Sequence, residues 1–318
     1  RKVKAETYAK AQPLLKKDAI FASNTSTLPI NSLAEEFRDQ SKFIGIHFFS
    51  PVEKMMLVEI IVGKNTNDTA LATALDYVRT IGKTPVVVND SRGFFANRCV
   101  LRFTAEGLEM LMEGVPPAMI ENTAKMAGMP VGPLSLSDEV ALDLVLKIMK
   151  ATEADLGANA IDQSQQKLLV EMVAKQGRFG RKNGKGFYDY PEKGKGQKSL
   201  WPALSGLQPK HLDPDTLDID EMKQRFLVVQ AVEAARTVED HVITDMREAD
   251  VGSILGFGFA PFTGGKLSYI DFMGTRKFVE LCRQHEANYG SSVTPPNRPI
   301  EGAAKEQPVH GPTPPTTR

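Results

Sequence analysis

Short apolar runs alternate with amphipathic stretches along the first ninety residues. An apolar run at residues 19–22, a run from Phe43 that ends at His47, a run that contains Glu59 and a run at residues 86–88 predict β-strands, because they are short and rich in β-branched or aromatic residues. Between the last two runs, Leu71, Leu75 and Val78 recur at helical spacing, which predicts an amphipathic helix over residues 69–80. Residues 2–15 form a further predicted helix. This alternation is typical of an α/β fold.

The β-strand signal ends near Arg92, and helical spacing follows. Residues 94–113 carry apolar side chains at helical intervals, and the predicted helix ends at Gly114. Pro116 and Pro117 open another helix, and residues 129–133 form a break before a third. We therefore expect residues 1–90 to belong to a sheet-containing domain and residues 91–190 to a mainly helical one.

A basic, glycine-rich stretch at residues 178–186 offers two interpretations. It could bind phosphate groups or nucleic acid, or it could form a hairpin that closes the first helical domain. The second is favoured, because the stretch runs directly into a strand-like aromatic segment at residues 186–190. No nucleic-acid partner and no metal site are predicted.

The last part of the chain contains a weak internal repeat. Residues 191–218 are rich in Pro, Lys, Gly and Asp and predict a linker, and residues 219–290 predict a second helical domain. Arg98 aligns with Arg225, Glu106 with Glu233 and Glu113 with Asp240 at one constant spacing, and Pro133 aligns with Pro261 one residue further on. Residues 291–318 are rich in proline and poor in bulky apolar residues, which predicts a disordered tail.

Four polar residues are candidates for catalysis. His47 ends one predicted strand and Glu59 lies inside the next, an arrangement that can build a positioned general base. Ser26 lies in a polar segment directly after a predicted strand, and Asn97 lies in the first turns of a predicted helix. Each residue has an ordinary alternative: a core histidine, a strand-edge charge, a turn residue and a helix-start residue.

The motifs around these residues resemble those of one family. The segments FASNTSTLPI, GIHFFSPVEKMMLVEIIVG, GKTPVVVNDSRGFFANR, MPVGPLSL and RFGRKNGKGFYDY are similar to the C-terminal portion of L-3-hydroxyacyl-CoA dehydrogenases, specifically the form in multifunctional fatty acid oxidation α-subunits. The resemblance spans roughly residues 2–290. It implies an incomplete Rossmann-type NAD-binding domain, followed by two repeat-related helical domains of the dehydrogenase C-terminal type.

The resemblance also implies roles for individual residues. His47 matches the catalytic base and Glu59 the carboxylate that orients it, while Ser26 and Asn97 match the pair that hydrogen-bonds the 3-oxygen of the substrate. Lys4, Asn24 and Ser26 match cofactor-contacting positions. The implied activity is NAD-dependent oxidation of L-3-hydroxyacyl-CoA to 3-ketoacyl-CoA in fatty acid β-oxidation. An acyl-CoA substrate and a homodimer, or membership of a multifunctional β-oxidation complex, follow from the same resemblance.

The glycine-rich loop that holds a dinucleotide pyrophosphate bears on this function. No G-x-G-x-x-G occurs in the first hundred residues, so we expect the chain to begin partway through its dinucleotide domain. A non-catalytic fragment that serves as a dimerisation or substrate-cleft module is therefore the alternative. A biosynthetic 3-hydroxybutyryl-CoA dehydrogenase would share the four residues, but the duplicated helical segment argues against it.

Composition adds few constraints. The 318 residues are 42% hydrophobic and 25% charged, with a formal net charge of zero, which is ordinary for a globular protein and favours neither nucleic acid nor a membrane surface. No apolar run approaches the ~20 residues of a membrane span. With only Cys99 and Cys282, no disulfide framework is predicted. We expect a cytoplasmic protein, and a mitochondrial or peroxisomal location stays open.

Overall fold

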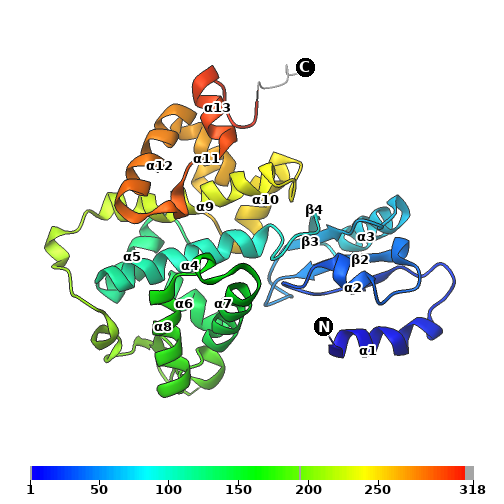
Figure 1. Ribbon diagram of the computed structural model, residues 1–318, viewed down its shortest axis with the longest axis horizontal. Helices are drawn as coiled ribbons and strands as arrows, with labels where there is room; N and C mark the ends of the chain where they lie inside the picture. The colour runs from blue at the N-terminus through cyan, green and yellow to red at the C-terminus, as the bar shows by residue number, and fades with distance from the viewer. Residues whose placement is uncertain (1, 193–194, 312–318) are drawn as a thin grey trace. The chain divides into compact units, whose positions relative to one another are not determined.

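The computed structural model describes residues 2–192 and 195–311 (Figure 1). The strands are β1 (Phe21–Ser23), β2 (Phe43–Phe48), β3 (Leu57–Val62), β4 (Thr84–Asn89), β5 (Tyr188–Asp189) and β6 (Ser199–Leu200). The helices before residue 200 are α1 (Lys2–Ala11), α2 (Ile30–Ala34), α3 (Asp68–Thr80), α4 (Ala96–Glu113), α5 (Pro117–Met126), α6 (Pro133–Val140), α7 (Leu142–Leu156) and α8 (Gln163–Val170). Those after it are α9 (Ile219–Glu239), α10 (Met246–Phe257), α11 (Lys266–Met273), α12 (Thr275–Tyr289) and α13 (Asn297–Lys305).

The first four strands form one mixed sheet in the order β1-β2-β3-β4. The β1–β2 and β3–β4 pairs are parallel, whereas β2 and β3 are antiparallel. The two central strands are buried along almost their whole length, which explains why they read as continuous apolar runs in the sequence. The expected fold class, an α/β part followed by a mainly helical part, is confirmed.

The core of this sheet forms where α3 covers it. Ile44, Ile46, Val58 and Ile60 of the central strands form one buried cluster with Ala74 and Val78 of α3. The helix begins where the side chain of Asn67 accepts a hydrogen bond from a backbone N–H of its first turn, at 2.8 Å. This packing holds the ends of β2 and β3, and so the predicted site residues on them, in a rigid frame.

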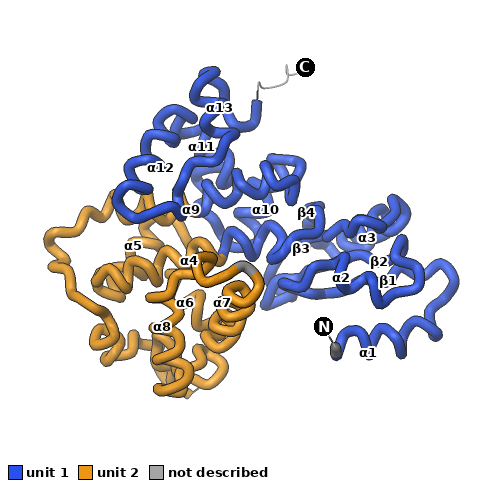
Figure 2. Tube along the Cα trace, in the orientation of Figure 1, with its two compact units in different colours: residues 1–100, 230–318 blue, residues 101–229 orange. Residues whose placement is uncertain are grey.

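The chain divides into two compact units, residues 1–100 with 230–318 and residues 101–229 (Figure 2). In the first unit β4 is tied to the later helical segment, because the backbone N–H of Val87 donates to Glu248 at 2.8 Å and that of Asn89 donates to Val242 O at 2.7 Å. The units follow contacts between distant segments rather than chain order. The domain boundaries expected from the sequence therefore stay predictions.

Hydrogen bonds at two helix starts show the internal repeat. The buried carboxylate of Glu121 accepts two consecutive N–H groups at the start of α6, the shorter bond coming from Leu134 at 2.7 Å. The carboxylate of Asp250 likewise accepts two consecutive N–H groups at the start of α11, the shorter coming from Leu267 at 2.8 Å. Both carboxylates satisfy backbone donors that an α-helix leaves unpaired.

These caps correct the alignment of the two copies. Because Leu134 and Leu267 occupy equivalent positions, Pro133 at the start of α6 corresponds to Lys266 at the start of α11. The alignment of Pro133 with Pro261 was wrong, since Pro261 begins a short 3₁₀ turn before α11. Matching the two prolines overlooked this extra turn in the second copy.

A second aspartate bonds to a later segment in each copy, and it is buried in the first copy and half-buried in the second. Asp138 accepts two consecutive N–H groups of the hairpin-like segment, including that of Tyr188 at 2.9 Å. Asp271 accepts two consecutive N–H groups near the C-terminus, including that of His310 at 3.3 Å. The residues after α13 therefore correspond, in the second copy, to the hairpin-like segment at residues 186–190 of the first copy. In the first copy, β5 of this segment pairs with β6, which lies in the predicted linker.

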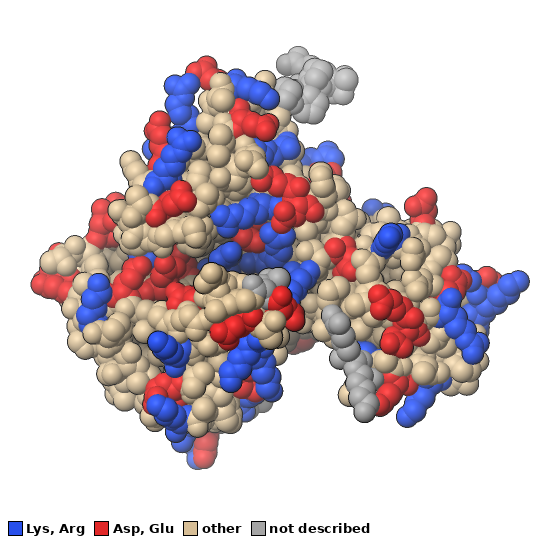
Figure 3. Space-filling view, in the orientation of Figure 1, with Lys and Arg blue, Asp and Glu red and all other residues tan. Residues whose placement is uncertain are grey.

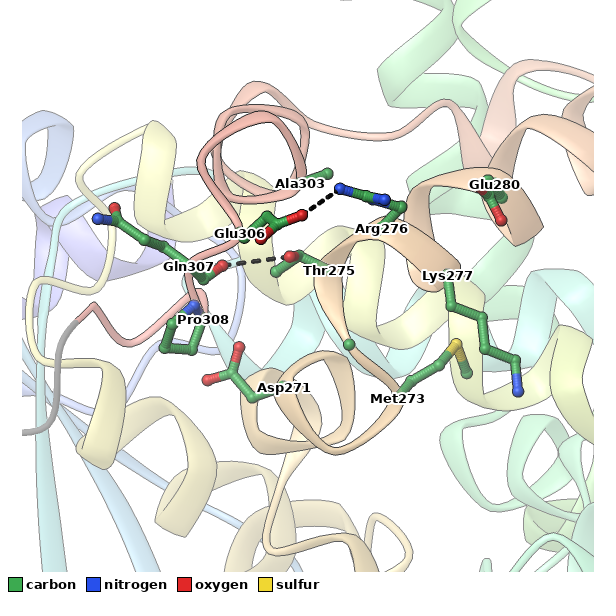
Figure 4. Close-up of a pocket in the computed structure, with 11 residues that line it drawn as sticks. Asp271, Met273, Thr275, Arg276, Lys277, Glu280, Ala303, Glu306, Gln307 and Pro308 are labelled. Atoms are coloured by element: carbon green, nitrogen blue, oxygen red, sulfur yellow. Dashed lines mark hydrogen bonds and ion pairs between the residues drawn. The ribbon is translucent and has the colours of Figure 1, made fainter.

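The predicted disordered tail was wrong for residues 291–311. This segment contains α13, and it is tied to α12 through the bond from Thr275 Oγ1 to Gln307 O at 3.1 Å and the ion pair of Arg276 with Glu306 at 2.6 Å (Figure 4). Its composition suggested disorder, but Asp271 and α12 supply bonding partners that composition does not reveal. Residues 312–318 lie outside the described part of the chain.

Candidate active site

His47 and Glu59 face each other across the antiparallel pair of β2 and β3. Because they are directly opposite, their side chains lie on the same face of the sheet. His47 Nδ1 lies 2.8 Å from Glu59 Oε2, and the two residues are 3% and 0% exposed. The pairing predicted from sequence is thus present as a buried histidine–carboxylate contact.

The start of α4 supports the same carboxylate. Glu59 Oε1 accepts the backbone N–H of Phe95 at 3.1 Å and that of Ala96 at 2.8 Å. A buried carboxylate is stable only when its oxygens are well hydrogen-bonded, and here the imidazole occupies one oxygen and two amides the other. The side chain of Glu59 is therefore fixed from two directions.

This arrangement defines the chemistry available to the imidazole. A carboxylate only accepts hydrogen bonds, so it holds the imidazole proton on Nδ1. The other ring nitrogen, Nε2, is then the one that can accept a proton from a substrate. A carboxylate bound to the far nitrogen also stabilises the imidazolium that forms, as a general base requires.

Ser26 and Asn97 are brought together by a direct contact. The side-chain amide of Asn97, in the first turn of α4, donates to the backbone carbonyl of Ser26 in the loop after β1. Ser26 is exposed and Asn97 is half-buried, so both can meet a ligand at this loop. The structure thus assembles the catalytic candidates as two bonded pairs on neighbouring elements of one compact unit.

The predicted cofactor-contacting residues lie around the end of β1. Asn24 Oδ1 accepts the backbone N–H of Phe48 at 3.1 Å, which joins the end of β1 to the end of β2. Lys4 Nζ, on α1, lies 3.5 Å from Ser23 Oγ. Because β1 and β2 are parallel, their carboxyl ends meet at one edge of the sheet, where open α/β sheets bind nucleotides. Lys4, Asn24 and Ser26 supply hydrogen-bond donors and acceptors of the kind that a dinucleotide contacts.

Two aromatic rings beside the histidine were not predicted as site residues. The ring of Phe49 is centred 4.6 Å from that of His47, and the ring of Phe94 is centred 6.0 Å from it. Phe94 is also fully buried and has a positive φ of 52°. In the sequence, only the position of each residue within a conspicuous segment pointed to it. Phe49 lies two residues after His47, and Phe94 directly follows Gly93.

Two cavities in the structure differ in their relation to the predicted site residues. One, of about 400 Å³, is lined mainly by apolar side chains of β1, β2 and α3 together with Asn24. The other, of about 640 Å³, lies around the start of α12 and the end of α13, and none of the predicted site residues lines it (Figure 4). On the face drawn in Figure 3, acidic and basic side chains are interspersed over both units.

Two family models match this chain. One, described as the NAD binding domain of 3-hydroxyacyl-CoA dehydrogenase, matches residues 1–91, and the other, the C-terminal domain of the same enzyme, matches residues 93–190. The fatty acid oxidation complex subunit alpha of Vibrio cholerae is 38% identical over 295 residues, which are 92% of this chain and 40% of that protein. The chain thus spans less than half the length of this curated relative.

Solved structures agree with these matches. A 3-hydroxybutyryl-CoA dehydrogenase from Escherichia coli shares the fold, with a TM-score of 0.76 at 20% identity over 96% of this chain and 79% of that one. An (S)-3-hydroxybutyryl-CoA dehydrogenase from Ralstonia eutropha is 34% identical, with a TM-score of 0.55 over 60% of this chain and 68% of that one.

A third solved structure matches most of the chain. The dehydrogenase part of multifunctional enzyme 1 from C. elegans has a TM-score of 0.64 at 25% identity, over 95% of this chain and 69% of that one. None of the described helices is both long and apolar enough to cross a membrane. With both domain models matched in sequence order, the chain belongs to the 3-hydroxyacyl-CoA dehydrogenase family.

Proposed function

We propose that this chain oxidises the 3-hydroxyl group of an L-3-hydroxyacyl-CoA to a ketone in fatty acid oxidation. The observation that carries this proposal is the buried contact of His47 with Glu59, which supplies a positioned proton acceptor. The name of the Vibrio relative supports the metabolic setting, since that protein is a subunit of a fatty acid oxidation complex.

Each of the four catalytic candidates has its own role in this oxidation. His47 Nε2 takes the proton of the substrate hydroxyl, while Glu59 keeps the ring in the required orientation and stabilises its positive charge. Ser26 and Asn97 donate hydrogen bonds to the substrate oxygen as it becomes a carbonyl. Donors placed for a developing charge typically contribute a few kcal/mol each to lowering a barrier.

Oxidation of the alcohol also removes a hydride from the carbon that bears the hydroxyl group. NAD would accept this hydride when bound, and Lys4, Asn24 and Ser26 are the residues that would contact it. The cytoplasmic location, and the homodimer or multifunctional complex, belong to this proposal as expected from the sequence. The non-catalytic module is its alternative.

The experiment is turnover by the purified chain, with acetoacetyl-CoA reduction followed through the absorbance of NADH. We expect His47→Gln to lower kcat by about a hundredfold or more, because glutamine cannot exchange a proton near neutral pH. His211→Gln is the matched control, since His211 is exposed and lies on a different segment.

Equal activity of the wild type and His47→Gln would contradict the proposed role. Absence of turnover and of NADH binding, in a sample that is folded by circular dichroism, would favour the non-catalytic alternative. Fluorescence titration with NADH separates loss of cofactor binding from loss of the proton acceptor.

A further inference from the structure

The turn between β4 and α4 has an unusual backbone. Gly93 and Phe94 both have positive φ, at 77° and 52°. Glycine adopts this region freely, but a bulky residue does so rarely and at a cost. Phe94 is also fully buried. A strained, buried phenylalanine persists only where the surroundings hold it in that conformation.

The conformation of Phe94 decides where the next two amides point. The N–H groups of Phe95 and Ala96 both reach one oxygen of Glu59, at 3.1 and 2.8 Å. Successive N–H groups that converge in this way after a left-handed residue form a small anion-binding concavity. The anion held in it is the carboxylate that contacts His47 through its other oxygen.

We propose that Phe94 is a positioning residue, whose left-handed backbone turns two amides onto Glu59 and so fixes the carboxylate against His47. Its ring lies against the histidine, with centroids 6.0 Å apart, so its ring and its backbone act on the same pair. This inference rests on the proposed function for its kinetic readout, but the geometry itself is independent of turnover.

The test compares two substitutions that differ in backbone preference. Phe94→Gly keeps the positive φ without strain, whereas Phe94→Val disfavours it, because valine is β-branched. Both variants lose the ring, so the difference between them reports the backbone. We expect kcat of Phe94→Val to be about tenfold or more below that of Phe94→Gly, with the KM values of the two variants within about threefold of each other. Phe103→Val is the control, being an equally buried phenylalanine in the regular part of α4.

A second readout does not depend on activity. The proton on His47 Nδ1, bound to a carboxylate, gives a strongly downfield NMR resonance that His47→Gln identifies by its loss. We expect this resonance in the wild type and in Phe94→Gly but not in Phe94→Val. If the valine variant does not fold, Phe94→Ala replaces it, with the expected order of kcat being glycine above alanine.

The outcomes separate the two proposals. An inactive wild type whose resonance follows this pattern would remove the proposed function and leave the positioning role standing. Equal losses in Phe94→Val and Phe94→Gly, or a resonance that is unchanged in all variants, would overturn the positioning role even in an active enzyme.

Discussion

At the scale of single residues, Lys266 is a cationic side chain buried among aromatic rings. Its side chain is fully buried, and Nζ lies 3.5 Å from the ring centroid of Phe257. Burial lowers the pKa of Lys266 from 10.5 to about 8. Cys99, whose pKa burial raises to about 11, is a neighbour that favours the charged amine.

We predict that Lys266→Met stabilises the protein at neutral pH by roughly 1 to 3 kcal/mol, because methionine carries no charge to bury. Below pH 8 the folded state carries the full cost of the buried cation. That cost disappears as pH rises from about 8 to 10.5, so wild-type stability should rise over this window and the variant's should not.

Urea unfolding at several pH values measures this difference. Lys277→Met, on the exposed side of α12, is the control and should leave the free energy of unfolding nearly unchanged. Parallel pH profiles for the wild type and Lys266→Met would show that the folded protein does not perturb the lysine.

The site illustrates what single residues reveal in a sequence. His47 and Glu59 could be paired because they end or occupy adjacent predicted strands, and the register confirms that they are opposite. The support from Phe95 and Ala96 could not be predicted, because it comes from backbone groups. Backbone direction depends on the φ of Phe94, which no side-chain pattern encodes.

At the scale of elements, helix starts are fixed by close contact with buried carboxylates. A Cβ atom added at Gly132, just before α6, would lie 2.3 Å from the carboxylate of Glu121. Glu121 is 2% exposed and bonded to the helix start, so it cannot move aside without losing those bonds. Glycine is therefore required here by space rather than by backbone conformation.

We predict that Gly132→Ala destabilises the protein by roughly 1 to 3 kcal/mol, through displacement of Glu121 and loss of the cap of α6. Gly206→Ala is the matched control, because a Cβ there meets nothing within 4 Å. Denaturant unfolding of both variants checks the prediction. A similar free energy of unfolding for the two would mean that the helix start accommodates the methyl group.

Element prediction succeeded where one element alone determines the pattern. The run that ends at His47 and the run that contains Glu59 correspond to β2 and β3, because strands buried on both faces are apolar throughout. It failed at residues 291–311, where order depends on bonds to Asp271 and α12 some distance away in the chain. Composition describes only the segment itself.

At the scale of the whole molecule, His310 anchors the C-terminal segment to two helices. Its Nδ1 lies 2.5 Å from Asp271 on α11 and its Nε2 lies 3.0 Å from Asp250 on α10. Hydrogen bonds to these two carboxylates raise the pKa of His310 from 6.5 to about 9. The equivalent position of the first copy is the neutral phenol of Tyr188, which donates to Glu121 at 2.7 Å.

We predict that the His310 contribution to stability is complete below pH 6.5 and is lost as pH rises through about 9, because the folded state binds the proton more tightly. His310→Gln should be less stable than wild type at pH 6 and should approach it above pH 9. Thermal unfolding across this range measures the difference, with His211→Gln as the exposed control.

Between about pH 8 and 9 the two titrations have opposite effects on the free energy of unfolding, because the contribution of His310 falls and that of Lys266 rises. The wild-type profile should therefore be flattened in this interval. In Lys266→Met the free energy of unfolding should fall as pH rises through this interval, and in His310→Gln it should rise. Identical slopes in both variants would show that other groups control the pH response.

The two copies of the helical segment are also bound by reciprocal charges. Arg98 of the first copy bonds to Glu233 and Asp240 of the second, each at 2.7 Å. Arg225 of the second bonds to Glu106 of the first at 2.6 Å. Each arginine thus depends on a carboxylate inherited by the other copy. A substitution of either arginine therefore removes bonds from a carboxylate of the other copy, so we expect the two helical segments to unfold together rather than separately.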